Sequence, residues 1–310
     1  MTGPIEQPHV RPWSTAMRVP TDDATAWFKA SGPGAAHEGP LLEVFRRRGI
    51  EHVLLPLAVH PERPWLLFDD GGPTLRATRP DGTGDHDIAA WERILPEYAV
   101  LQRSVESEEI RDEMLVAGVP DGRPSRLSGE LARLLEDDVA WSRIMDDERV
   151  AADAARRRLR GSLTAVEAAV AELEAAGIPA SIQHDDLHGG NILVGPDGDR
   201  FFDWGDAVIG HPFSTLTTTF NSIAHHTGRV LDDPVFEGLR DVYTQAWSDR
   251  LPAADQARVV ALARALGCVS KSLAWERNLT GLEPDEMDGN GDAVAGWLIE
   301  FDERFAGLTR

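Results

Sequence analysis

The sequence has little cysteine and no long apolar segment. Its one cysteine, Cys268, has no partner for an internal disulfide, as is usual in proteins of a reducing compartment. No apolar run approaches the roughly 20 residues that span a bilayer, and residues 1–8 lack the basic and apolar regions of a signal peptide. We therefore expect a cytoplasmic protein with no membrane partner.

Basic side chains are scarce as well. The 310 residues include 31 basic and 52 acidic side chains, for a net charge of −21. Because binding to a phosphate backbone needs a basic face, this excess of acid argues against nucleic acid as a partner. The charge is uneven, since residues 1–75 carry a net −2 and residues 76–310 a net −19. Lysine supplies only two of the basic side chains.

The most informative stretch is Ser181–Val194, which reads S-I-Q-H-D-D-L-H-G-G-N-I-L-V. Its apolar end, a Pro-Asp-Gly turn at 196–198 and the following F-F-D-W-G at 201–205 predict a β-hairpin. The hairpin would bring together three side chains that carry oxygen atoms: Asp186, Asn191 and Asp203.

The spacing H-x-D-x-x-x-x-N followed by D-x-G suits phosphoryl transfer. Asp186 would orient the acceptor hydroxyl and take its proton late in the transfer. Asn191 and Asp203 would hold Mg²⁺, which prefers oxygen ligands and leaves other positions to phosphate and water. The alternative roles are structural: a solvated loop aspartate, a turn cap and the end of a strand.

The two motifs resemble those of the aminoglycoside phosphotransferase and choline kinase-like family of small-molecule kinases, whose loop commonly reads H-G-D-L-H-x-x-N. This chain carries Asp185 where the family has Gly. The resemblance covers roughly residues 10–220. It implies an α+β, two-lobed protein kinase-like fold, with a small β-rich N-terminal lobe (1–75) and a large helical C-terminal lobe (76–310).

The resemblance also implies an activity. We expect an ATP- or GTP-dependent phosphotransferase that uses Mg²⁺ and transfers the γ-phosphoryl group to a hydroxyl of a small molecule. An aminoglycoside-like antibiotic, an amino sugar or a related alcohol would be the acceptor. In this family the C-terminal helices build the acceptor site, so the motifs leave the acceptor unidentified, and oligomeric state is undecided.

The N-terminal region has the order of a kinase-like small lobe. Strands are predicted at 14–19, 24–29, near 52–59 and at 65–68, with a helix at 38–48 between the second and third. Lys29 ends a strand and Glu38 opens the helix, which resembles the lysine–glutamate ion pair of kinases. Glu43, on another face of the helix, is the other candidate partner.

A hinge is predicted at 69–73, where D-D-G-G-P ends the fourth strand. Adenine would lie against Asp69, Asp70 and Gly71, with Leu193 on the floor of the pocket. Beyond the hinge the apolar spacing predicts helices at 87–104, 126–137, 148–175, 214–225, 234–248, 253–275 and 283–305.

There are three alternatives to this interpretation, two of them based on other sequence patterns. His184 and His188 have the H-x-x-x-H spacing of a zinc hydrolase, but two such histidines share a metal only on a helix, and two glycines follow directly. A catalytically silent nucleotide-binding protein is the second alternative. The stretch 32–37 partly matches a dinucleotide fingerprint, although His37 stands where Gly or Ala is required.

Two residues near the second motif depart from the family or have an ambiguous role. Asp206 is interpreted as an N-cap rather than as a further metal ligand. Thr215 replaces an Asp that the family usually has, so the brace under the catalytic loop is either loosened or replaced by a hydrogen bond from Thr215.

An acidic cluster near the C-terminal end bears on the acceptor. Between Asn278 and Glu303 there are eight acidic side chains and no basic one: Glu283, Asp285, Glu286, Asp288, Asp292, Glu300, Asp302 and Glu303. If the cluster faces the cleft it would concentrate a cationic acceptor. If it faces water it serves solubility alone.

Overall fold

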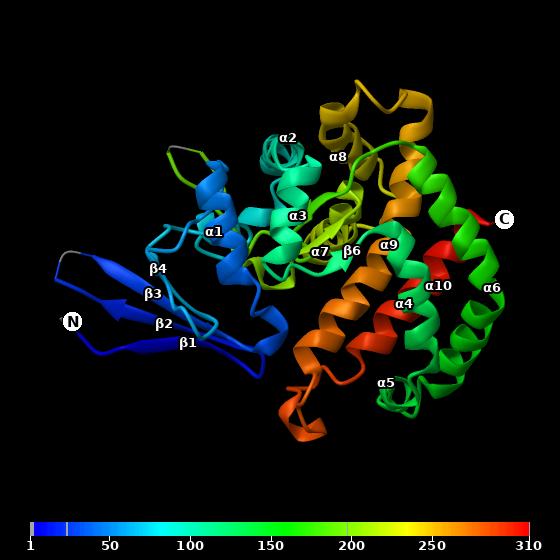
Figure 1. Cartoon of the computed structure of the whole chain (residues 1–310), viewed down its shortest axis with the longest axis horizontal. Helices are drawn as coiled ribbons and strands as arrows, with labels where there is room; N and C mark the ends of the chain where they lie inside the picture. Colours follow the sequence, from blue (N-terminus) through cyan, green and yellow to red (C-terminus); the bar gives the residue numbers. More distant parts are fainter. Residues whose placement is uncertain (1–2, 23, 197, 310) are drawn as a thin grey trace.

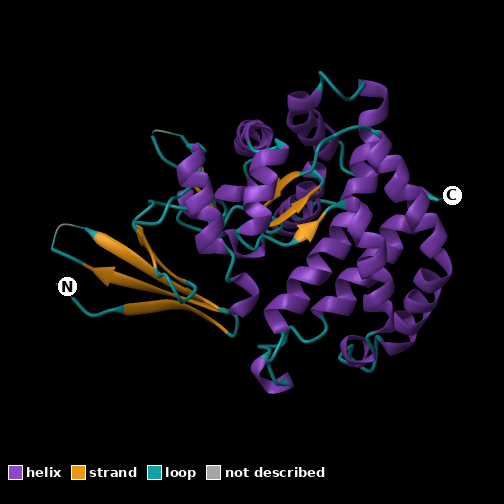
Figure 2. Cartoon of the chain, in the orientation of Figure 1, coloured by secondary structure: helices purple, strands orange, loops and turns teal. Residues whose placement is uncertain are grey.

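The N-terminal region is an antiparallel sheet in a computed structural model that describes residues 3–22, 24–196 and 198–309. Its strand order is β1-β2-β3-β5-β4, and the sheet projects from one end of the molecule (Figures 1 and 2). The strands are β1 (Glu6–Arg11), β2 (Ser14–Pro20), β3 (Thr25–Ser31), β4 (Ala58–Val59) and β5 (Trp65–Asp69).

One helix, α1 (Glu38–Arg48), packs against this sheet and has the predicted bounds. Leu41 and Phe45 on its inner face are fully buried. The helix ends where Gly49 adopts a left-handed conformation with φ 63°, the usual glycine C-terminus of a helix. The ring of Phe45 packs edge-on against Trp204 of the second motif, with 5.2 Å between ring centroids.

The sheet differs from the prediction at two strands. β1 was not predicted. The strand predicted near 52–59 forms only at β4, because His52 leaves the extended conformation with φ 62°. The residues after it add to the catalytic hairpin instead: Val53 makes a parallel bridge with Phe201, whose carbonyl accepts a hydrogen bond from the Leu54 amide at 3.1 Å.

The rest of the chain is mainly helical, as Figure 2 shows. Its helices are α2 (Ile88–Ser104), α3 (Glu108–Val116), α4 (Pro124–Glu136), α5 (Asp138–Ser142), α6 (Arg149–Ala175), α7 (Leu216–Thr227), α8 (Val235–Thr244), α9 (Ala253–Leu279) and α10 (Ala293–Leu308). The seven predicted helices are all present, and α2 continues through Pro96. The prediction missed α3 and α5, and residues 283–292 contain only a short 3-10 turn.

Short strands among these helices carry the motifs. β6 (Asp121–Gly122), β10 (Val208–Gly210) and β7 (Ser181–Gln183) form one sheet, and β8 (Ile192–Leu193) pairs antiparallel with β9 (Arg200–Phe201). The predicted hairpin is therefore confirmed, although Asp197 of its turn lies outside the described residues.

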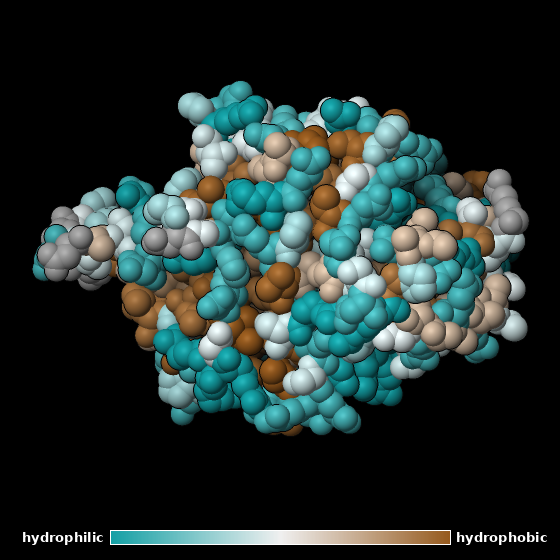
Figure 3. All heavy atoms as spheres, turned by 90° about the horizontal axis from the view of Figure 1, so that it is seen from above, coloured by the Kyte–Doolittle hydropathy of each residue, from teal (hydrophilic) through white to brown (hydrophobic). Residues whose placement is uncertain are grey.

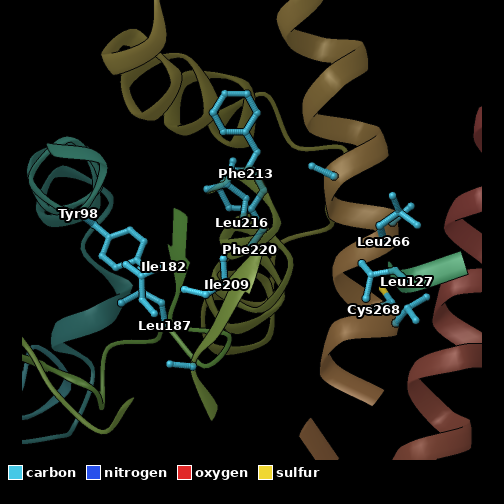
Figure 4. Close-up of a cluster of buried hydrophobic side chains, with 14 of the residues drawn as sticks. Tyr98, Leu127, Ile182, Leu187, Ile209, Phe213, Leu216, Phe220, Leu266 and Cys268 are labelled. Atoms are coloured by element: carbon cyan, nitrogen blue, oxygen red, sulfur yellow. The ribbon is translucent and has the colours of Figure 1, made fainter. Parts of the chain in front are cut away.

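Figure 4 shows the hydrophobic core beneath this region, where Tyr98 of α2 points toward Ile182 of β7 and Leu187 of the loop that follows β7. All three side chains are fully buried. The loop between β7 and β8 thus starts from a packed base and not from a mobile surface segment.

The face of the molecule in Figure 3 is mostly hydrophilic, with hydrophobic residues in small separate groups. Among the described residues, no helix combines the length and apolar character that a membrane crossing requires.

Candidate active site

The catalytic loop departs from regular structure directly after β7. Asp185 lies in the left-handed region with φ 63°, a conformation that glycine adopts freely and aspartate tolerates at a cost of about 1 kcal/mol. This backbone conformation explains how Asp185 occupies a position where the family usually has glycine. Its carboxylate is buried and accepts a hydrogen bond from the Ser270 hydroxyl of α9 at 3.0 Å.

Hydroxyls from α7 brace the loop from below. The Thr218 hydroxyl donates to the carbonyl of Asp185 at 3.0 Å, and the Thr219 hydroxyl to the carbonyl of Leu187 at 2.9 Å. Thr215 is buried, but no hydrogen bond from its hydroxyl to the loop is present in the described part of the chain. The brace therefore comes from the two threonines that follow and not from Thr215.

Asp186 is held by three donors and still reaches solvent. Its Oδ1 lies 2.9 Å from the Lys271 ammonium, and its Oδ2 lies 3.2 Å from the Asn191 amide nitrogen and 3.4 Å from His188 Nε2. Because 32% of the side chain is exposed, a ligand can still approach the carboxylate. Burial alone would raise the pKa of Asp186, but the Lys271 charge and the His188 contact outweigh it and hold the pKa well below its usual range.

Asn191 and Asp203 are brought together by the hairpin. The Phe202 amide donates to the Asn191 carbonyl at 3.2 Å, so Asp203 follows the residue that faces Asn191. The Asn191 side-chain amide also donates to the Asp186 carbonyl at 2.9 Å. Because the amide nitrogen of Asn191 makes these contacts, its oxygen Oδ1 is left without a hydrogen-bond donor among the described residues. Asp203 Oδ2 likewise accepts no hydrogen bond from a described residue.

Lys29 joins the sheet to the second motif. Its ammonium lies 2.7 Å and 2.6 Å from the two carboxylate oxygens of Glu38 and also contacts Asp203 Oδ1. Burial would lower the pKa of Lys29, but the charges of Asp203 and Glu38 outweigh it and raise the pKa, so Lys29 stays charged. The Lys29 centre is the name used below for Lys29, Glu38 and Asp203.

The hinge residues lie beside the hairpin. Gly71 packs so closely on Leu193 that a Cβ at this glycine would lie 2.3 Å from a Leu193 methyl group, and its carbonyl accepts from Arg200 at 2.8 Å. Asp69 and Asp70 are exposed and bond to backbone amides within the hinge itself. Leu193 therefore packs directly against Gly71 of the hinge.

Three sequence alternatives do not fit the geometry. Glu43 is partly exposed and pairs with Arg46 of its own helix, whereas Lys29 pairs with Glu38. Asp206 was wrongly interpreted as a cap, because both its carboxylate oxygens bind other side chains. The zinc-hydrolase spacing lacks the helix it requires, since His184 and His188 flank the left-handed Asp185.

The structure agrees with setting aside the partial dinucleotide fingerprint at 32–37. Pro33–Ala35 is a 3-10 turn, and a Cβ at Gly34 would lie 2.5 Å from the carbonyl oxygen of Arg277 in α9. The glycine there permits close packing between the N-terminal region and α9 and does not line a pyrophosphate site.

The sequence prediction missed the residue that binds Asp186 from the far side of the site. Lys271 lies in α9, 85 positions from Asp186, and contacts both Asp186 and Asp206. The Lys271 centre is the name used below for Lys271, Asp186 and Asp206. The one available signal was the rarity of lysine in this arginine-rich chain.

A protein family matches the segment of the chain that carries both motifs. Residues 113–259 match the family described as the phosphotransferase enzyme family, a stretch that contains Asp186, Asn191 and Asp203 but neither lysine. No curated protein matches the chain significantly in sequence. The matched family is one of phosphotransferase enzymes, so the resemblance to small-molecule kinases drawn from the motifs is confirmed.

Solved structures show the same fold over nearly the whole chain. An ethanolamine kinase from Plasmodium vivax aligns with a TM-score of 0.61 at 12% identity, covering 95% of this chain and 82% of that one. A choline kinase from Streptococcus pneumoniae aligns with a TM-score of 0.59 at 15% identity, covering 99% and 95%. APH(2")-IIia, solved with GDP and kanamycin, gives 0.57 at 15% identity, covering 98% and 93%. The predicted two-lobed kinase-like fold is confirmed.

Proposed function

We propose that this protein transfers the γ-phosphoryl group of ATP or GTP to a hydroxyl of a small molecule. Residues 1–75 would form the nucleotide-binding lobe, and residues 76–310 the catalytic and acceptor-binding lobe. The observation that carries the proposal is the Lys29 centre, in which a lysine of the sheet contacts Asp203 of the second motif. That contact brings the two halves of a phosphoryl-transfer site together.

The residues present fit a magnesium–nucleotide complex. Asn191 Oδ1 and Asp203 Oδ2 are oxygen ligands with no protein partner among the described residues. No three His, Cys, Asp or Glu side chains gather as a metal group in the described part of the chain, so the remaining ligands would be phosphate and water. When bound, Mg²⁺ would neutralise charge on the nucleotide phosphates.

The side chains then divide the work of an in-line transfer. Lys29, held by Glu38, binds the nucleotide phosphates, and the hinge at 69–71 with Leu193 receives the base. Asp186 accepts a hydrogen bond from the acceptor hydroxyl. The acceptor oxygen forms a bond to the γ-phosphorus as the bond to the nucleotide's bridging oxygen breaks, and the hydroxyl proton passes to Asp186 late in the step.

The low pKa of Asp186 agrees with this order of events. A carboxylate that Lys271 keeps ionised, against the effect of burial, is a weak base. It orients the hydroxyl from the start and takes the proton only when the new bond makes that proton acidic. Positioning and charge neutralisation therefore supply most of the rate.

The acceptor is the open part of the proposal. The solved relatives include choline and ethanolamine kinases and an enzyme in complex with kanamycin, so aminoglycoside-like antibiotics, amino sugars and choline-like alcohols head the panel. Nucleosides, peptide antibiotics and homoserine-like amino acids complete it.

A nucleotide-turnover screen over this panel, with Mg²⁺ and either ATP or GTP, tests the proposal. We expect at least one acceptor to stimulate turnover in the parent and not in Asp186→Asn. Nucleotide binding without turnover for any acceptor would support a catalytically silent protein. Stoichiometric bound zinc and activity without nucleotide would support a hydrolase and overturn the proposal.

A further inference from the structure

Lys271 is a buried charge that the motifs do not account for. Its side chain is 5% exposed, and its ammonium lies 2.9 Å from Asp186 Oδ1 and 2.6 Å from Asp206 Oδ2. The Asn278 amide donates to the other oxygen of Asp206 at 2.9 Å. A chain of contacts thus runs from the end of α9 through Asp206 and Lys271 to Asp186.

The two lysines of the chain have matching roles in this arrangement. Each contacts one carboxylate of the segment Asp203-Trp-Gly-Asp206, Lys29 the first and Lys271 the last. Basic side chains elsewhere in the sequence are arginines. An ammonium is a compact charge on a flexible stem, whereas a guanidinium is planar and needs a wider space, so a buried position between two carboxylates suits lysine.

We propose that Lys271 is a positioning residue of the phosphoryl-transfer site, which holds Asp186 toward the acceptor hydroxyl and offsets the negative charge that gathers there. The inference rests on the proposed function. Nucleotide phosphates, Asp203 and Asp186 would all bring negative charge to one cleft. Lys29 serves the nucleotide side of that cleft, and Lys271 the acceptor side.

A purely structural role is the alternative to be tested. In that case Lys271 would only neutralise two half-buried carboxylates and stabilise the fold, since an unpaired buried charge is costly. The two roles can be distinguished by a variant that removes the excess negative charge left by the loss of Lys271 but does not give Asp186 a new cation.

The variants for this test are Lys271→Met and the double variant Lys271→Met/Asp206→Asn. The first leaves both carboxylates without their cation, whereas the second also removes one of the two negative charges. Ser272→Ala is the matched control, because Ser272 is equally buried on α9 but bonds to the Val294 carbonyl of α10 at 2.7 Å, away from the catalytic loop.

We expect Lys271→Met to lower both the melting temperature and the turnover rate. The loss of turnover should be about 10²–10³-fold, the usual effect of removing one preorganised charge from a transition state. The double variant should recover the melting temperature but not the turnover, and both should keep the nucleotide KM within a few-fold. Recovery of turnover together with stability would overturn the proposal, as would an equal loss in Ser272→Ala.

A second measurement does not depend on activity. Because the chain holds two lysines, ¹⁵N-lysine labelling gives two side-chain ammonium signals. Asp186→Asn should shift one of them, which assigns it to Lys271, and Ser272→Ala should not. Mg²⁺–ADP should shift the Lys29 signal alone, and a non-hydrolysable analogue of ATP or GTP should shift both.

The outcomes distinguish this inference from the proposed function. If neither signal responds to any nucleotide, the proposed function fails and Lys271 is structural. If Lys29 responds to the γ-phosphate analogue while Lys271 does not, nucleotide binding stands and the positioning role is overturned.

Discussion

The Lys29 centre and the Lys271 centre are built alike but differ in their surroundings. Each holds one ammonium between two carboxylates. In the Lys29 centre Glu38 is almost fully buried whereas 46% of the Asp203 side chain is exposed. In the Lys271 centre the lysine is the most buried member and both carboxylates are partly exposed.

The difference indicates what each centre does. An exposed Asp203 with one oxygen free is open to a ligand that arrives with the nucleotide. A buried Lys271 between partly exposed carboxylates has no direct approach from solvent, so it acts through Asp186. We infer that the Lys29 centre binds the nucleotide with its metal ion and that the Lys271 centre orients Asp186.

Disrupting the Lys29 centre should have the largest effect. Asp203→Ala removes the contact with Lys29 and the free oxygen proposed for Mg²⁺. We expect activity to be lost and the Mg²⁺-dependent part of nucleotide affinity to disappear in calorimetry with and without Mg²⁺. Glu43→Gln is the control, since Glu43 lies on α1 but forms its ion pair with Arg46 and not with Lys29. A variant that titrates Mg²⁺ like the parent would place the ligands elsewhere.

Disrupting the Lys271 centre should affect rate more than binding. Asp186→Asn keeps the size of the side chain but removes the base, and turnover should fall by about 10²–10⁴-fold. Nucleotide affinity should stay within a few-fold of the parent, because the proposed role of Asp186 is toward the acceptor hydroxyl and not toward the nucleotide. Steady-state kinetics at varied nucleotide concentration gives both the turnover rate and the nucleotide KM. A variant that keeps most of its activity would refute the assignment.

Local sequence patterns predicted those parts of the site whose residues lie within one helix or one hairpin. The bounds of α1 and the β8–β9 hairpin follow from apolar spacing and turn residues, and they place Glu38, Asn191 and Asp203. Ser107 also gave a usable signal for α3, because its hydroxyl caps the helix by accepting from the Ile110 amide, but it was missed.

Contacts between distant segments left no such pattern. Lys271 meets Asp186 only because α9 packs beside the catalytic loop, and a lone lysine in a helix says nothing about which loop it will face. Likewise Asp206 is the last residue of the 3-10 turn Trp204–Asp206, and its contacts with Lys271 and Asn278, both distant in sequence, decide its role. The glycine-to-aspartate change at Asp185 became interpretable only once its φ of 63° was known.

Asp185 gives a prediction of smaller size, on stability beside the Lys271 centre. Burial raises the pKa of Asp185 to about 7 from its usual value of 3.8. Between these values the folded protein holds a proton that the unfolded chain has lost, so stability should fall as pH rises from about 4 to 7, at up to roughly 1.4 kcal/mol for each pH unit.

Asp185→Asn should flatten that decline. Asparagine tolerates the left-handed conformation and has no charge to bury. Urea unfolding of parent and variant at several values between pH 4 and 8 makes the comparison, with the exposed Asp153→Asn on α6 as control. Parallel stability curves for parent and Asp185→Asn would show that Asp185 is ionised throughout.

The smallest effect is expected outside both centres, at the acidic loop between α9 and α10. Glu300 and Asp302 already pair with Arg304 and Arg158. The loop itself carries Asp285, Glu286 and Asp288, which are exposed, although Asp288 also contacts Arg11 of β1 at 3.2 Å.

If these three charges attract a cationic acceptor, its KM should rise several-fold with salt, because the screening length shrinks from about 10 Å at 0.1 M to about 3 Å at 1 M. Replacing the three with their neutral amides should flatten the slope and leave the nucleotide KM unchanged. Asp146→Asn, exposed on the loop before α6, shows the effect of losing one negative charge away from this loop. An acceptor KM that keeps both its value and its salt dependence in the triple variant would make the three charges a solvated surface and would weaken the case for a cationic acceptor.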